Sequence, residues 1–187
     1  AIEAGRHGRV IVLCKGRTDE SNSYQAQGGL AAVLDPADSI DAHVADTLAT
    51  GAGLSDEAVV RRVIGEAPEH IRQLQDWGVA FDTADGRLSL GREGGHSANR
   101  IVHAEGDATG KAVSEVLAAR ARQREAVKLF DACFAIDLIT DPPEGGPGST
   151  CLGALTYHER YGLLFVLARW TILAAGGAGV LWRETTN

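Results

Sequence analysis

A continuous apolar run near the start of the chain, residues 9–14, constrains the fold more than any other feature. Its sequence RVIVLC is rich in β-branched residues and shows no alternation of apolar and polar positions. Such a run is typical of a strand buried in a parallel sheet. Lys15-Gly16 ends the strand and a polar segment follows. The start of the chain therefore predicts an α/β domain.

Capping residues and glycines predict three helices after this strand. Ser39 is expected to cap a helix that ends near residue 50, and Ser55 a longer helix that ends near residue 77. Pro68 should kink this second helix or split it in two. A third helix is expected over about 109–125. The middle of the chain is thus predicted to be mostly helical.

The remaining segments predict short strands and loops. A small hairpin is expected around Asp85-Gly86, a loop over 93–106 and another over 141–149. Strands are expected over 134–139, over 152–157 paired with 163–168, and over 171–174 as a last buried strand. The predicted organisation is a strand and loop over 9–34, an insert over about 35–125, and returning strands over about 132–187.

Charge and composition exclude several classes of protein. The net charge is −7 and the pI is about 5.3, which argues against nucleic acid as a partner. The apolar stretch 163–181 carries Arg169 and a glycine run, so no membrane span is expected. Three widely spaced cysteines without a CxxC motif predict neither a zinc site nor a disulfide framework, and favour a reducing, cytoplasmic location. The histidines at 43, 70, 103 and 158 lack metal-ligand spacing and are interpreted as structural or exposed.

Three glycine-containing segments are candidate binding sites. Residues 20–29 combine hydroxyls and amides with two glycines, which lets a backbone approach a cofactor closely. Residues 92–97 place an acid and an imidazole around two glycines, and residues 172–179 are an apolar run that ends in glycines. Each pattern alone also fits an ordinary solvated loop or turn.

The order and spacing of these segments carry a stronger signal than any one of them. The blocks RVIVLCKG followed by ESNSYQAQGGLAAV, then REGGHSANRIVHAEGDATG, then TILAAGGAGVLWRETTN, closely resemble L-aspartate oxidases. That family belongs with the flavoprotein subunits of succinate dehydrogenase and fumarate reductase. The resemblance implies an α/β fold: an incomplete Rossmann-like FAD-binding domain, over 1–187, with a mostly helical insert.

The resemblance also implies which residues line the cofactor. In the family, the Lys at the strand end and the segment that ends in QGG contact FAD. The matching residues here are Lys15, Asn22, Ser23, Tyr24, Gln25, Ala26, Gln27, Gly28 and Gly29. The family's ATGG turn matches residues 174–177, where Ala175 replaces the usual Thr and removes one hydroxyl.

Two positions distinguish the subfamilies. Enzymes that attach FAD covalently have a His where this chain has Asn22, whose amide cannot form the link, so non-covalent FAD is expected. Succinate dehydrogenases and fumarate reductases usually have an apolar residue where this chain has Glu93. A carboxylate there can pair with the ammonium of aspartate and would repel a dicarboxylate that lacks one.

The implied function is oxidation of L-aspartate to iminoaspartate, the first step of quinolinate and NAD synthesis. Oxygen or fumarate is the expected electron acceptor, and quinolinate synthase an expected partner. The dinucleotide glycine turn should precede Ala1, and the catalytic Arg and further substrate-binding residues should follow Asn187. No catalytic residue is therefore assigned within the chain, which alone is expected to be inactive. The alternatives are a soluble fumarate reductase or succinate dehydrogenase flavoprotein, and a non-catalytic piece of an FAD fold.

Overall fold

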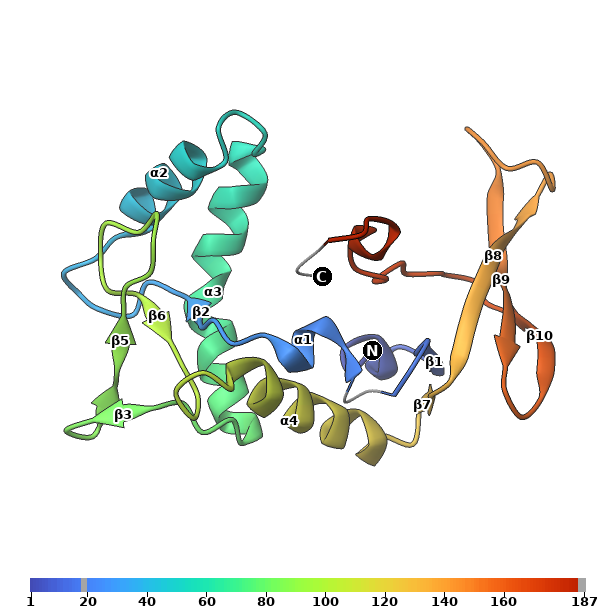
Figure 1. Cartoon of the computed structure of the whole chain (residues 1–187), viewed down its shortest axis with the longest axis horizontal. Coiled ribbons are helices and arrows are strands. Elements are labelled where there is room, and N and C mark those ends of the chain that lie inside the picture. The colour runs from blue at the N-terminus through green and yellow to red at the C-terminus, as the bar shows by residue number, and fades with distance from the viewer. Residues whose placement is uncertain (18–19, 185–187) are drawn as a thin grey trace. The chain divides into compact units, whose positions relative to one another are not determined.

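The computed structural model describes residues 1–17 and 20–184 and divides the chain into two compact units. Unit 1 comprises Ala1–Asn22 and Ala121–Asn187, and unit 2 comprises Ser23–Arg120. Each unit has its own strands, which Figure 1 labels in chain order. The elements of unit 1 are η1 (Ala4–Arg6), β1 (Val10–Leu13), β7 (Val127–Phe130), β8 (Cys133–Asp141), β9 (Thr150–His158), β10 (Gly162–Leu167) and η3 (Gly179–Leu181).

The parallel strand predicted at residues 9–14 is confirmed, but its predicted burial is wrong, because its residues are only half-buried or exposed and Ile11 is 48% exposed. It forms β1, which pairs in parallel with β7, with Val10 opposite Val127 and Leu13 opposite Phe130. The sequence analysis did not predict β7, because its four residues mix Lys128 with apolar neighbours and show no regular pattern. The first paired residues of the two strands, Val10 and Val127, are 117 positions apart. The two strands can therefore pair only when the intervening chain folds back to bring β7 beside β1.

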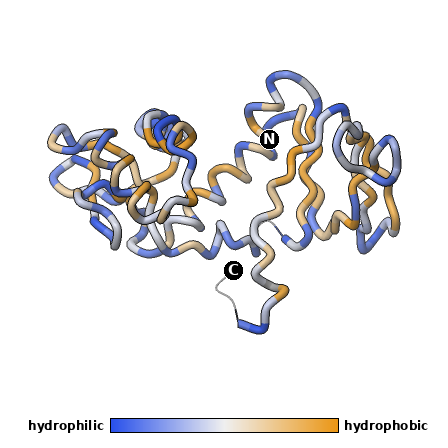
Figure 2. Tube along the Cα trace, turned by 90° about the horizontal axis from the view of Figure 1, so that it is seen from above, coloured by the Kyte–Doolittle hydropathy of each residue, from blue (hydrophilic) through white to orange (hydrophobic). Residues whose placement is uncertain are grey.

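The other strands of unit 1 form an antiparallel sheet in the order β10-β9-β8. The predicted pairing of 152–157 with 163–168 is confirmed, since Leu163 lies opposite Tyr157 and Leu167 opposite Gly153. Figure 2 shows that the extended strands of this unit are largely hydrophobic in colour. The strand expected over 171–174 is wrong: these residues form no strand, and Ile172 is 79% exposed. An apolar run becomes a buried strand only beside a partner strand, and no described strand pairs with this one.

Unit 2 combines helices with short strands. Its elements are α1 (Asn22–Gln25), β2 (Leu30–Ala31), α2 (Ile40–Thr50), α3 (Glu57–Trp77), β3 (Thr83–Ala84), β4 (Arg87–Leu88), β5 (Leu90–Gly91), β6 (Ile101–Val102) and α4 (Thr109–Gln123). The first residue of α1 and the last three of α4 belong to unit 1. β2, β6 and β5 form one antiparallel sheet, and β3 pairs with β4 around Asp85-Gly86 as predicted. The 93–106 segment is not wholly loop, because β6 lies within it.

The helix limits follow from their caps. The Ser39 hydroxyl accepts a hydrogen bond from the Ala42 amide at 3.1 Å, which confirms the predicted start of α2. α3 is capped by Asp56 and not by Ser55, because the Asp56 carboxylate reaches the Val59 amide at 3.1 Å and adds negative charge at the positive helix end. Pro68 lies inside α3 without splitting it, and Gly78 ends the helix at φ 108°.

The hydrophobic core of unit 2 lies between α3 and the β2-β6-β5 sheet. Ile71 comes from α3, Val102 from β6, and Phe81 from the segment between α3 and the β3-β4 hairpin. Ala32, Val79 and Ala104 complete the buried cluster. This core fixes the backbone on both sides of the candidate site. Within the described residues, no helix combines the length and apolarity needed to cross a bilayer.

Candidate functional site

The first part of the site is the segment 22–29, which packs against the start of α4. The Gly110 amide donates a hydrogen bond to the Ala26 carbonyl at 2.9 Å, and the Tyr24 hydroxyl bonds Glu115 Oε1 at 3.1 Å. A Cβ on Gly110 would collide with the Ser23 carbonyl oxygen and lie 2.7 Å from the Ala26 oxygen. Gly110 therefore permits the close approach that shapes this segment.

The segment ends at Gly28-Gly29, where the backbone enters β2. A Cβ on Gly29 would collide with the Ile101 side chain and the Val102 carbonyl oxygen, both on β6. Only glycine fits this position, because β6 backbone cannot move aside. The second glycine of the predicted cofactor loop, Gly29, thus has a structural cause in the pairing of β2 with β6.

Glu93 lies directly beside this glycine pair, as the second part of the site. Its Oε1 accepts a hydrogen bond from the Gly29 amide at 3.4 Å and lies 3.1 Å from His103 Nε2. The Glu93 side chain is 48% exposed and that of His103 is 26% exposed. The end of the predicted cofactor loop, at Gly29, is therefore in contact with Glu93, the residue predicted to bind the substrate.

His103 is the residue that the sequence analysis missed. It was grouped with the structural or exposed histidines, and His43 (buried) and His70 (exposed) fit that description. His103 instead contacts a candidate site residue. No spacing rule identifies it, because it lies ten positions from Glu93 along an irregular segment and reaches the site only through the β5-β6 pairing.

A buried ion cluster anchors the segment that carries Glu93. The fully buried Arg100 guanidinium makes two bonds of 2.8 Å to Asp38 and one of 2.6 Å to Asp46. The Asp46 carboxylate also accepts hydrogen bonds from the Ser97 amide at 2.8 Å and the Ser97 hydroxyl at 2.7 Å. These bonds tie residues 97–100 to the start and middle of α2.

The same bonds shift the acidities within the cluster. Hydrogen bonds from Ser97, and then from Arg100, lower the pKa of Asp46 to about 2. Hydrogen bonding to Arg100 lowers the pKa of Asp38. Burial, followed by the nearby Arg100 charge, lowers the pKa of His43, whose Nδ1 is buried without a partner. These shifts favour the charged forms of Asp38 and Asp46 and the neutral form of His43.

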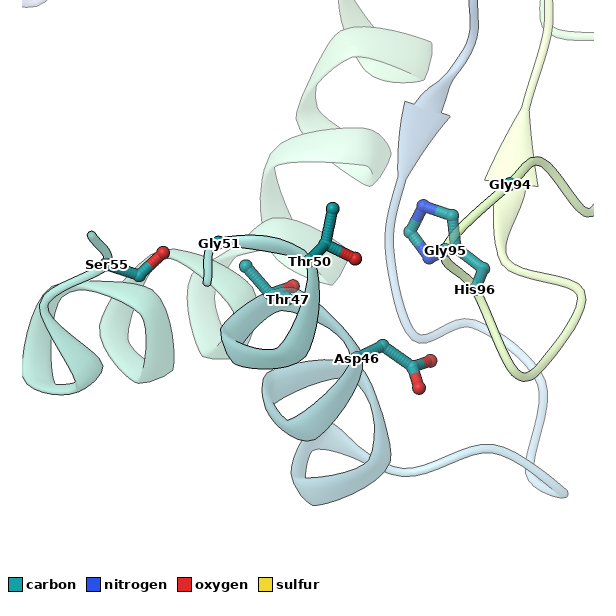
Figure 3. Close-up of a pocket in the computed structure, with 8 residues that line it drawn as sticks. All are labelled: Asp46, Thr47, Thr50, Gly51, Ser55, Gly94, Gly95 and His96. Carbon is teal, nitrogen blue, oxygen red and sulfur yellow. The ribbon is translucent and has the colours of Figure 1, made fainter. Parts of the chain in front are cut away.

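An open pocket of about 300 Å³ lies between the second half of α2 and the glycines that follow Glu93. Figure 3 shows the Asp46 carboxylate and the His96 imidazole on its wall. The lining residues are Asp46, Thr47, Thr50, Gly51, Ser55, Gly94, Gly95 and His96. Because Asp46 is already bonded to Ser97 and Arg100, this wall is part of the anchor that holds residues 93–97 in place.

The other predicted cofactor residues lie in unit 1. Lys15 is exposed directly after β1, and the backbone on either side of it is fixed by bonds from Cys133 to Cys14 and from Ala132 to Gly16. Residues 174–177 lie in an exposed, irregular segment, with Gly176 at φ 75°. The structure thus describes Lys15 and the 174–177 turn in one unit, and Ser23 through Gly29 in the other.

The chemistry of segment 22–29 fits a dinucleotide cofactor. Asn22, Ser23, Gln25 and Gln27 are exposed, so their amides and hydroxyl are accessible to phosphate and ring edges. Gly29 lets the main chain run close to β6, where a side chain would collide. In the described residues, no group of His, Cys, Asp and Glu side chains has the arrangement of a metal site.

Comparison with known proteins identifies the cofactor class. The model of the "FAD binding domain" family matches residues 1–187. The chain belongs to the FAD binding domain family. This FAD binding domain is 42% identical over 189 residues to L-aspartate oxidase 2-b, chloroplastic, of Nicotiana tabacum, and 44% identical over 192 residues to L-aspartate oxidase 1 of Ralstonia nicotianae. It is a homologue of L-aspartate oxidases over its whole length.

The chain spans about a third of the length of those relatives. The alignments cover 100% of this chain, 29% of the tobacco protein and 36% of the Ralstonia protein. Among solved structures, a mutant of E. coli quinol fumarate reductase FrdA matches with a TM-score of 0.88 and 27% identity. That match covers 97% of this chain and 30% of FrdA. The FAD binding domain is therefore a mixed α/β chain that corresponds to part of the flavin domain of fumarate reductase-like flavoproteins.

Proposed function

We propose that this FAD binding domain is part of a longer flavoenzyme that oxidises L-aspartate to iminoaspartate, the first step of quinolinate and NAD synthesis. The observation that carries the proposal is the contact of Glu93 Oε1 with the Gly29 amide. It places a half-exposed carboxylate beside the glycines of the cofactor segment. The identity of 42–44% to L-aspartate oxidases supports the same substrate.

We assign cofactor binding to Lys15 and to the segment from Asn22 through Gly29. When bound, FAD supplies the hydride acceptor, and the protein supplies position and charge. Asn22 is exposed at the start of α1, where its amide can donate or accept hydrogen bonds but cannot form a covalent link to the flavin. The proposed cofactor is therefore non-covalent FAD.

Glu93 is the proposed determinant of substrate choice. Its carboxylate would pair with the substrate ammonium, a group that aspartate has and succinate and fumarate lack. A succinate dehydrogenase or fumarate reductase activity is the second candidate, because the match to FrdA has a TM-score of 0.88. A carboxylate at position 93 disfavours this candidate, since it would repel a dicarboxylate that brings no ammonium.

The remaining features of the proposal come from the same resemblance. The described units would be parts of an incomplete Rossmann-like FAD-binding domain, with the helical residues about 35–125 inserted between its strands. Oxygen or fumarate would reoxidise the flavin, and quinolinate synthase would take the product. A cytoplasmic location stays a prediction, because the names of the plant relatives place those proteins in chloroplasts.

The decisive experiment is Glu93→Gln in the FAD-loaded full-length enzyme, which keeps the side-chain shape and removes its charge. Loss of one partner of a hydrogen-bonded charge pair costs about 2–5 kcal/mol, so aspartate kcat/KM should fall roughly 30-fold or more. Fumarate reduction should be unchanged or faster. The matched control is Glu66→Gln on α3, an exposed carboxylate whose ion-pair partners among the described residues lie on its own helix. Equal losses with both substrates would show that Glu93 serves the flavin site or the fold and would refute the assignment.

A further inference from the structure

We propose that His103 is a positioning residue that holds the Glu93 carboxylate in the orientation needed to receive the substrate ammonium. The inference rests on the proposed function, because it deepens the role of Glu93. His103 Nε2 lies 3.1 Å from Glu93 Oε1, and the Gly29 amide approaches the same oxygen at 3.4 Å. Both contacts use Oε1, which leaves Oε2 as the oxygen that we assign to the ammonium.

The surroundings of His103 show a site shaped around its ring. A Cβ on Gly91 would lie 3.1 Å from His103 Cε1, and a Cβ on Gly29 would lie 3.0 Å from His103 Cδ2. Both distances are tighter than ordinary contact, so a side chain at either position would displace the imidazole. Two glycines, one on β5 and one at the end of the cofactor segment, therefore flank the ring.

Hydrogen bonds and burial also fix the backbone around His103. The His103 carbonyl accepts a hydrogen bond from the Asp82 amide at 2.8 Å, and the next residue, Ala104, is fully buried. The Ala104 amide donates to the Thr109 hydroxyl at 3.1 Å. With its backbone held, His103 is a rigid donor, whereas Glu93 belongs to an exposed segment and has a flexible side chain.

This arrangement predicts a division of labour between the two residues. His103 and the Gly29 amide orient the carboxylate, and Glu93 supplies the charge that the substrate meets. A Glu93 without its donor keeps its charge but samples several rotamers, so recognition of the ammonium weakens while the chemical step is unaffected. The expected signature is a rise in the KM for aspartate without a matching loss of kcat.

The test compares His103→Phe, which keeps a ring and removes the donor, with His103→Gln, whose amide can replace Nε2–H. Loss of a charge-assisted hydrogen bond should raise the aspartate KM roughly tenfold in His103→Phe, with kcat little changed. His103→Gln should restore most of the affinity. The inhibition constant of succinate, which has no ammonium, should stay nearly constant in both. His70→Phe is the control, because His70 is an exposed histidine 3.9 Å from a glutamate on α3.

A second readout needs no activity. In the 187-residue chain, amide hydrogen exchange at Gly29 should accelerate in Glu93→Ala, which removes the acceptor of that amide, and in His103→Phe, which leaves the acceptor mobile. It should not accelerate in His70→Phe. Unchanged Gly29 exchange in His103→Phe would overturn the inference even if that variant failed to load FAD. The inference would also be overturned if His103→Phe changed the aspartate KM and the succinate inhibition constant equally, or if its kinetics matched those of His70→Phe.

The two proposals can fail separately. If Glu93→Gln shows no selective loss of activity with aspartate, the proposed function fails. If Glu93→Gln shows that loss and His103→Phe changes neither the KM nor the Gly29 exchange, only the role of His103 fails.

Discussion

The two units differ in which side chains they bury and which they expose. Unit 2 buries a charged residue, Arg100, whose guanidinium is fully enclosed and paired with Asp38 and Asp46. Unit 1 exposes apolar ones: Phe134, Tyr157 and Leu163 lie side by side across β8, β9 and β10, and each is at least 47% exposed. Unit 2 therefore pairs its buried cation internally, whereas the sheet of unit 1 has an apolar face of the kind that marks an interaction surface.

The difference teaches where each unit obtains its stability. In unit 2, the hydrophobic cluster includes Val102 of β6 and the ion cluster includes Arg100, which precedes β6, so residues far apart in sequence depend on each other. In unit 1, backbone pairing organises the sheet, but many side chains on it gain little from burial. Substitutions should thus be costly in the core of unit 2 and mild at the exposed positions of the sheet of unit 1.

The largest effect is expected from Arg100→Met, which removes the cation and leaves Asp38 buried without its partner. Breaking a buried pair in this way typically costs about 3–5 kcal/mol in the free energy of unfolding. Urea unfolding followed by Trp77 fluorescence, with Trp170 and Trp182 changed to Phe, reports on unit 2. Arg87→Met on the exposed β4 is the control and should change little. A loss below 1 kcal/mol in Arg100→Met would contradict the role of the cluster.

A similar but more variable loss is expected from Ile71→Ala in the core of unit 2. Truncating a buried Ile costs about 2–5 kcal/mol, depending on how far the cavity collapses. The matched change in unit 1 is Ile172→Ala, at 79% exposure, which should stay within about 0.5 kcal/mol. Both can be measured by chemical denaturation. Equal costs at the two positions would remove the contrast between the units.

Acidification should lower the free energy of unfolding by less than these substitutions do, because the protonated Asp46 side chain still occupies its position beside Ser97. The folded-state pKa of Asp46 is about 2, below its ordinary value of 3.8, so the unfolded chain takes up the proton first. The stability that Asp46 contributes is complete above about pH 4 and is lost as the pH falls to about 2. Asp46→Asn should flatten this part of the pH profile of the Trp77 transition. An unchanged profile would show that Asp46 is not held by these bonds.

The pKa of His43 adds a contribution with the same sign at higher pH. Burial lowers its pKa in the folded state below the ordinary 6.5, so stability declines as the pH falls below about 6.5. His43→Gln should remove that first decline and leave the one from Asp46. This separates the two groups within one titration.

The smallest effect on stability is expected from Phe165→Ser on β10, where the side chain is 73% exposed. The free energy of unfolding should change by less than about 0.5 kcal/mol. Self-association at high concentration, followed by sedimentation velocity, should decrease because the apolar face of the sheet is interrupted. Phe81→Ser, in the buried core of unit 2, should instead unfold that unit. If Phe165→Ser destabilises strongly, the face is not free.

Local signals predicted most of the elements. The apolar run that became β1, the Ser39 cap of α2 and the Asp85-Gly86 hairpin depend on residues within a few positions of each other. The cap of α3 was a local error of one residue, whereas the errors about strands occurred where a distant partner decides the outcome. The apolar residues at 171–174 lack a partner strand in the described structure, and β7 exists because β1 lies beside it.

The sequence by itself determined the family and the candidate residues, because glycines, a carboxylate and an amide at fixed spacing leave a recognisable pattern. Only the tertiary structure decided that Glu93 meets Gly29, that His103 reaches Glu93, and that Arg100 is buried with two aspartates. The physical reason is that hydrogen bonds and ion pairs form between atoms close in space. Antiparallel pairing of β2, β6 and β5 brings together residues from three separate stretches of the chain, a proximity that no local pattern records.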